Sequence, residues 1–159
     1  MNSWRTTLLI LFLAFAVNGY SQDFDRPSFY AAMASDNVTQ IDKQLEIVSK
    51  SSITGKEAFE GALAMKKAGL IKGAGKKLNL FKAGHKKLET ALNKDAGNAE
   101  YRFLRLMIQE NAPGILGYKN DLEKDSTIVV TQFKTLPPHV QQAVTDYSKY
   151  SKVIKPSDL

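Results

Sequence analysis

The sequence predicts an all-α domain, a bundle of five or six helices stacked as antiparallel hairpins. The first observation is spacing, because apolar residues recur every three or four positions along most of the chain, which is the period of a helix buried on one side. The second is composition: 159 residues with 43% apolar and 24% charged side chains are enough for one domain of ordinary size. The third is the absence of cysteine, which excludes a disulfide framework, thiol catalysis and cysteine-based metal sites.

The chain begins with the pattern of an export signal. A basic residue precedes an unbroken apolar run over residues 8–17, and the small residues Gly19 and Ser21 follow at the spacing that a signal peptidase recognises. The run would extend about 15 Å as a helix, whereas a bilayer core of about 30 Å needs about 20 residues. We therefore predict a signal peptide over residues 1–21, in preference to a membrane anchor or a buried first helix. Residues 22–159 would then form a single helical domain in the periplasm or outside the cell.

Two helices are predicted at the start of this domain. Pro27 can open the first, because a proline lacks the N–H that would be unpaired at a helix start. Asp36 can cap the second. Over residues 36–50 the apolar stripe consists of Val38, Ile41, Leu45 and Val48.

The next two helices flank a glycine-containing break, LIKGAG. Before the break, Thr54 can cap a helix, Glu57 can complete a capping box with it, and Gly69 can stop it. Small residues on the stripe of that helix allow a neighbouring helix to approach closely. The stripe consists of Ala58, Ala62, Met65 and Gly69. After the break, residues 76–94 carry the most regular apolar stripe of the chain, made of Leu78, Phe81, His85, Leu88 and Leu92.

Further signals in the sequence predict the last helices. Asn98 can cap a helix that ends before Pro113, and its apolar face is wide enough to predict a central position. Residues 120–136 fit the helical period, but the β-branched residues of 126–133 also suit a strand, and this alternative stays open. A pair of prolines at positions 137 and 138 opens the final helix.

Residues 84–101 resemble part of a tetratricopeptide repeat (TPR). The matching helix positions are Gly84, Leu88, Ala91 and Leu92. They are followed by KDAGNAEYR, which resembles the turn into the next repeat, with Ala96 in place of the usual proline. The match covers about half a repeat, so it implies a helical hairpin and a fold that is TPR-like in part.

A second resemblance covers much of the chain after residue 21. The segments GALAMKKAG and AEYRFLRLMIQENAP are similar to small exported helical proteins of Bacteroidota that have no assigned activity. This resemblance implies a periplasmic or secreted helical protein. It carries no functional residues across to this sequence.

The positive charge is concentrated in two neighbouring predicted helices. The chain has 22 Lys and Arg against 16 Asp and Glu, a formal net charge of +6, and residues 61–88 contain eight lysines and no acid. These lysines are the candidate anion-binding or partner-binding face: Lys66, Lys67, Lys72, Lys76, Lys77, Lys82, Lys86 and Lys87. The alternative is a solvated face that also stabilises helix C-termini. Nucleic acid is not expected, because the segment lacks arginine and a ladder of aromatic residues.

No catalytic or metal-binding pattern stands out. Two histidines, His85 and His139, cannot make a His-rich metal site within one chain. The spacing of Asp121, Glu123 and Asp125 suggests a calcium loop, but the required glycine and closing glutamate are missing, so we expect these acids in the first turn of a helix. We predict that His85 is a packing residue, which would act as a base or ligand only if the fold brings a carboxylate to it in a cleft. No metal or cofactor is predicted.

Three classes of function stay open. The predicted one is a non-catalytic module that binds a protein or peptide through a groove between helices or through the lysines. The alternative is peripheral binding to an anionic surface, either lipid headgroups or an acidic polymer, through the lysine face of residues 66–87. The third is an enzyme built on His85, and it is not the predicted class.

Overall fold

A computed structural model describes residues 23–159, and this part of the chain is all-helical. It contains seven α-helices and no strand, which confirms the predicted all-α fold and is compatible with the predicted bundle. The signal peptide predicted for residues 1–21 lies outside the described residues. The helices are α1 (Arg26–Ala34), α2 (Val38–Lys50), α3 (Lys56–Leu70), α4 (Ala74–Lys94), α5 (Ala99–Asn111), α6 (Leu122–Gln132) and α7 (Pro138–Ser148).

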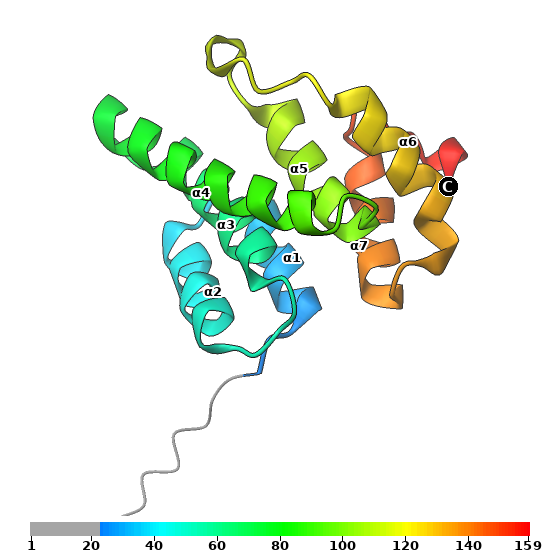
Figure 1. The fold of residues 1–159 in the computed structure, drawn as a ribbon, viewed down its shortest axis with the longest axis horizontal. Coiled ribbons are helices and arrows are strands. Elements are labelled where there is room, and N and C mark those ends of the chain that lie inside the picture. The colour runs from blue at the N-terminus through cyan, green and yellow to red at the C-terminus, as the bar shows by residue number, and fades with distance from the viewer. Residues whose placement is uncertain (1–22) are drawn as a thin grey trace, which may run out of the picture.

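The closest helix pair is the hairpin of α3 and α4, which lie side by side (Figure 1). A Cβ added to Gly61 of α3 would lie 2.7 Å from the carbonyl oxygen of Gly84 on α4, and the reverse holds for a Cβ on Gly84. The two backbones therefore touch, as the small residues of α3 predict. The contact is made by Gly61, because this residue faces α4, whereas Ala58 and Ala62 of the predicted stripe are buried in the main core.

The centre of the domain is α5, as the width of its apolar face predicts. Ten of its thirteen residues are buried, and Phe103, Leu104 and Leu106 have no exposed side-chain surface. The neighbouring α6 settles the alternative left open for residues 126–133. They are helical up to Gln132 and continue into a 3-10 turn, and Val129 is fully buried.

Of two predicted helix caps, one is confirmed and the other is wrong. Asn98 caps α5 as predicted, since its side chain accepts a hydrogen bond from the amide of Tyr101 at 3.1 Å. The prediction of Asp36 as the cap of α2 is wrong, because Asn37 takes that place and accepts from the amide three residues on at 3.2 Å. Asp36 lies one residue too early and instead pairs with Lys66 on α3, at 3.0 Å.

The capping box predicted from Thr54 and Glu57 is also wrong. The N-cap of α3 is Gly55, which has a left-handed backbone with φ of 69° and makes no capping hydrogen bond through a side chain. A Cβ at position 55 would clash with the hydroxyl of Tyr101, which donates a 3.4 Å hydrogen bond to the carbonyl of Thr54. The start of α3 is thus set by packing against α5 and not by a local side-chain cap.

None of the helices described within residues 23–159 combines the length and the apolar character that a membrane span requires. The longest, α4, has 21 residues and carries several lysines. Its first turns extend past the end of α3 (Figure 1), and residues 74–79 are exposed. This overhang positions the site described below.

The backbone contact between α3 and α4 generates the first prediction. We expect Gly61→Ala to lower the free energy of unfolding by about 1–3 kcal/mol, because the added methyl group forces two helix backbones apart. Urea unfolding followed by circular dichroism measures this change.

The control is Gly69→Ala in the same helix, where a Cβ would meet nothing within 4 Å. There the gain in helix propensity should raise stability by up to about 1 kcal/mol. Equal effects at positions 61 and 69 would contradict the close contact.

Candidate binding groove

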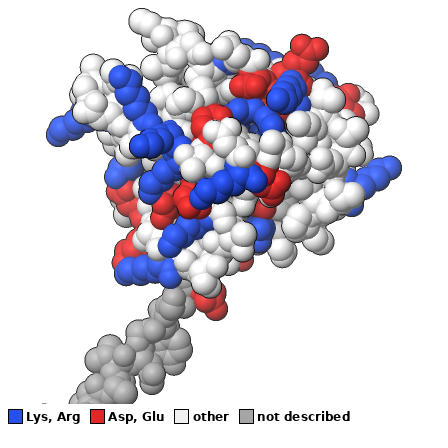
Figure 2. All heavy atoms as spheres, viewed as in Figure 1, with Lys and Arg blue, Asp and Glu red and all other residues white. Residues whose placement is uncertain are grey.

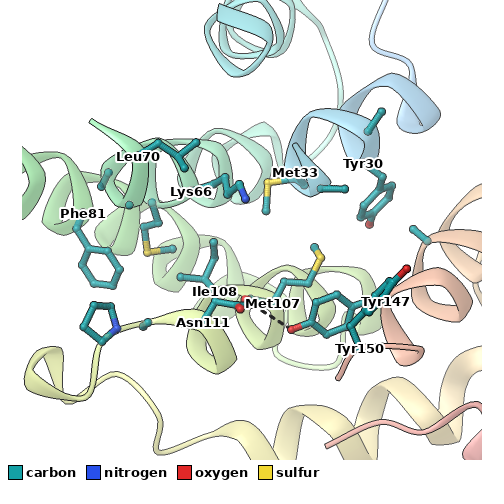
Figure 3. A pocket seen from close by; sticks show the side chains of 18 of the residues that line it. Tyr30, Met33, Lys66, Leu70, Phe81, Met107, Ile108, Asn111, Tyr147 and Tyr150 are labelled. Carbon is teal, nitrogen blue, oxygen red and sulfur yellow. Dashed lines mark hydrogen bonds between the residues drawn. The ribbon is translucent and has the colours of Figure 1, made fainter. Parts of the chain in front are cut away.

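A groove with a volume of about 980 Å³ opens between five helices (Figure 3). Its walls come from α1 and α3 on one side, from α5 and α7 on the other, and from the first turns of α4 at one end. The lining is mostly apolar. Pockets of this size and character are typical of ligand-binding or partner-binding sites.

Methionine side chains line the middle of the groove. Met33 on α1, Met65 on α3 and Met107 on α5 are the three methionines of the described chain, and all three belong to the lining. Figure 3 shows Met33 and Met107 reaching toward the groove from its two sides. Methionine is unbranched and polarizable, so such a surface adapts to the shape of an apolar partner.

Large exposed apolar side chains surround the groove. Within residues 23–159 there are three of them, Leu78 at 41%, Ile115 at 95% and Tyr150 at 85% exposure, and all three line this groove. Scattered apolar residues on a surface need no explanation, but their gathering around one cavity indicates an interaction site. This gathering is the strongest functional signal in the structure.

One of these side chains corrects a prediction from the sequence. Leu78 belongs to the stripe predicted to lie in the core, but it lies in the exposed first turns of α4 and lines the groove. Tyr150 follows α7, which ends at Ser148, and its side chain is exposed. Helical spacing identifies an apolar face and does not show whether another element covers it.

Two tyrosine hydroxyls inside the groove are already hydrogen-bonded. The hydroxyl of Tyr30 donates to Glu100 at 3.2 Å, and that of Tyr147 donates to Glu110 at 2.8 Å and accepts from Asn111 at 3.3 Å. Burial raises the pKa of both tyrosines, and the neighbouring carboxylates raise it further. Both phenols therefore stay protonated near neutral pH, and neither is an activated nucleophile or base.

The eight candidate lysines do not form one face. Three of them are paired with acids: Lys66 with Asp36 at 3.0 Å, Lys67 with Asp42 at 2.5 Å and Lys87 with Glu60 at 2.5 Å. Figure 2 shows Lys and Arg on this side of the molecule with Asp and Glu between them. Of these eight lysines, four have no hydrogen bond or ion pair from the ammonium group to residues 23–159: Lys72, Lys76, Lys82 and Lys86. Two members of the set, Lys66 and Lys77, line the groove itself.

A buried ion cluster lies behind the groove, and the sequence analysis missed it. Asp125 is fully buried and accepts from Arg105 at 2.7 and 2.8 Å and from Arg102 at 3.0 Å. Arg105 also donates to Glu89 at 2.9 Å, and Glu89 accepts from Tyr118 at 2.8 Å. The cluster joins α4, α5 and α6. The available signal was the pair of arginines one turn apart on the most buried helix, since a buried charge needs a partner.

The acids predicted for the first turn of a helix lie there. Asp121 is the N-cap of α6, and Glu123 and Asp125 are in its first turn. His85 is partly buried, and its ring centroid lies 4.7 Å from that of Tyr118. Its Nε2 atom is 3.7 Å from Glu89, a carboxylate that Arg105 and Tyr118 already engage.

Metal binding has no clear location in the described part of the chain. Within residues 23–159, no group of three or more His, Cys, Asp and Glu side chains is arranged to hold a metal ion.

Comparison with protein-family models, with curated proteins and with solved structures finds no match to this chain. The function is therefore argued from the geometry of the groove.

The ion cluster generates the second prediction. We expect Asp125→Ala to lower the free energy of unfolding by about 3–5 kcal/mol, because it leaves two buried guanidinium groups without their shared partner. Urea unfolding measures the loss. The control is Asp121→Ala, since Asp121 is 39% exposed and lies 3.4 Å from Arg105; this change should cost less than about 1 kcal/mol. A small loss of stability in both variants would contradict the role of Asp125 as the shared partner of the two arginines.

The raised tyrosine pKa values generate the third prediction. The folded protein holds these phenolic protons to a higher pH than the unfolded chain, in which tyrosine has a pKa of about 10. Unfolding therefore releases protons above pH 10. The free energy of unfolding then falls as the pH rises, by up to about 1.4 kcal/mol per pH unit for each such tyrosine. The free energy of unfolding at pH 9, 10 and 11 measures the slope. Tyr147→Phe should make it shallower, and an unchanged slope would contradict the role of Tyr147.

Proposed function

We propose that this chain is an exported, non-catalytic interaction module whose groove binds an apolar helical segment of a protein or peptide. The observation that supports this most directly is that the large exposed apolar side chains of residues 23–159 all surround one groove of about 980 Å³. Export is proposed from residues 1–21, which carry the pattern of a signal peptide. The absence of catalysis is proposed from the tyrosines of the groove, whose hydroxyls are protonated and hydrogen-bonded.

The walls of the groove favour a helix as the occupant. They are themselves helices, whose backbone N–H and C=O groups are paired within each helix, so they offer no row of free backbone groups to an extended strand. A helical segment pairs its own backbone and presents apolar side chains every three or four residues. The methionines can adjust to those side chains.

A second candidate function has support from the lysines. Lys72, Lys76, Lys82 and Lys86 are exposed and lie on the loop before α4 and on α4 itself. Each lysine near an anionic membrane contributes about 1 kcal/mol to binding, so the four together would hold the protein at such a surface. Salt-sensitive binding to phosphatidylglycerol vesicles, with none to phosphatidylcholine vesicles, would favour this candidate.

The groove generates the fourth prediction. The probe is a fluorescein-labelled, amphipathic 16-residue peptide with leucine at every third or fourth position and glutamine and alanine elsewhere. We expect the purified protein to bind it, with binding followed by fluorescence anisotropy. Leu78→Ser combined with Ile115→Ser should weaken binding at least tenfold, because each leucine or isoleucine that is buried by a partner contributes about 1.5–3 kcal/mol.

The matched control is Leu80→Ser, two residues along the same helix. Leu80 is partly exposed and lies on the other side of α4, outside the groove. This variant should change the affinity less than twofold. Failure of the wild-type protein to bind, or an equal loss in both variants, would overturn the proposed function.

A further inference from the structure

On the premise that the groove binds a helical segment, as proposed above, we infer that this segment is acidic at the end that lies beside the start of α4. The groove is apolar along its length but has a charged group at that end. The occupant is therefore an amphipathic helix with glutamate or aspartate in one terminal turn. The lysines that recognise it are Lys77 and Lys76 of α4, with Lys66 and Lys72 beside them.

Charge at this end of the groove is positive and weakly neutralised. Lys77 lines the groove, and its ammonium group donates only to the carbonyl of Gly69, at 3.3 Å. Lys76 and Lys72 are exposed and have no acidic partner among residues 23–159. Lys66, which also lines the groove, pairs with Asp36. An acidic occupant would supply the missing negative charge next to an apolar wall, where water screens it less.

The placement of Lys76 and Lys77 argues against a purely structural role. Lysines stabilise a helix at its C-terminus, where the helix dipole is negative, and Lys67 in the last turn of α3 fits that role. Lys76 and Lys77 lie instead at the positive end of α4, in a first turn that contains no acid, after Gly73, which offers no capping side chain. Lys77 also donates to the carbonyl of Gly69 in the last turn of α3, whereas Lys76 makes no such contact, so an anionic partner explains Lys76 better than stability does.

The other end of the groove lacks this positive charge. Apart from tyrosines, the ionisable side chains that line it there are His139 and Asp146 of α7. A hydrogen bond from Gln142 and an ion pair with Lys149 at 2.7 Å hold the pKa of Asp146 below its ordinary value, so this group is a carboxylate. The groove is thus asymmetric, and an acidic end of the occupant has one favourable place.

The test compares two peptides on the wild-type protein. Both are the amphipathic 16-residue helix described above, and they differ only in the last turn, which carries three glutamates in one peptide and three glutamines in the other. We expect the glutamate peptide to bind about tenfold more tightly in 20 mM salt. Its advantage should shrink to less than about threefold in 500 mM salt, where charges are screened within a few ångströms.

Variants connect this advantage to the lysines. Lys76→Gln combined with Lys77→Gln should remove most of the preference for glutamate, measured as the ratio of the affinities of the two peptides for this variant. The matched control is Lys124→Gln combined with Lys134→Gln, at two exposed positions on and after α6, outside the groove lining. That variant should keep the full preference.

The outcomes separate this inference from the proposed function. If both peptides bind with equal affinity in low salt, the groove function stands and the acidic partner is overturned. If neither binds, both are overturned. The inference is also overturned if the preference for glutamate persists in the Lys76 and Lys77 variant, or if the control variant loses it equally. In either case residues elsewhere on the surface bind the glutamates.

Discussion

The backbone contact between Gly61 and Gly84 is the constraint on which the rest of the structure depends. It fixes the line of α4 against α3, with no side chain between the two helices. The first turns of α4 lie at one end of this hairpin, where residues 74–79 are exposed. Those turns carry Leu78, Lys76 and Lys77. They form one end of the groove and contribute positive charge there.

The opposite side of the groove is held by ionic contacts. Asp125 ties α6 to α5 through two arginines, and Glu89 of α4 joins the same network and holds Tyr118 in the segment between α5 and α6. This segment also carries Ile115 at the rim of the groove. A buried ion network of this kind is weak evidence for stability but fixes where its members lie. The groove thus lies between two parts of one bundle, one held by the α3–α4 backbone contact and the other by the ion cluster.

Periodicity and local signals predict much of this fold. The spacing of apolar residues identifies α2, α4 and α5, and Asn98 marks the start of α5 correctly. The wrong predictions concern positions where contacts between residues far apart in the sequence determine the structure. Gly55 starts α3 because Tyr101 fills the space of a larger residue, and Asp125 is buried because two arginines of another helix reach it. Neither partner is close in sequence, so a local pattern can indicate that the buried arginines need an acid but cannot identify which one.

The groove itself could not be predicted, for a related physical reason. A helix that will be covered by another helix of its own chain and one that will be covered by a partner present the same apolar stripe. Under the proposed function, a bound helix would complete the core around Leu78, which has the spacing of a core residue. The hydroxyls of Tyr30 and Tyr147 within the groove are already hydrogen-bonded, so a partner could add apolar contact there without rearranging the hydrogen bonds of these two side chains.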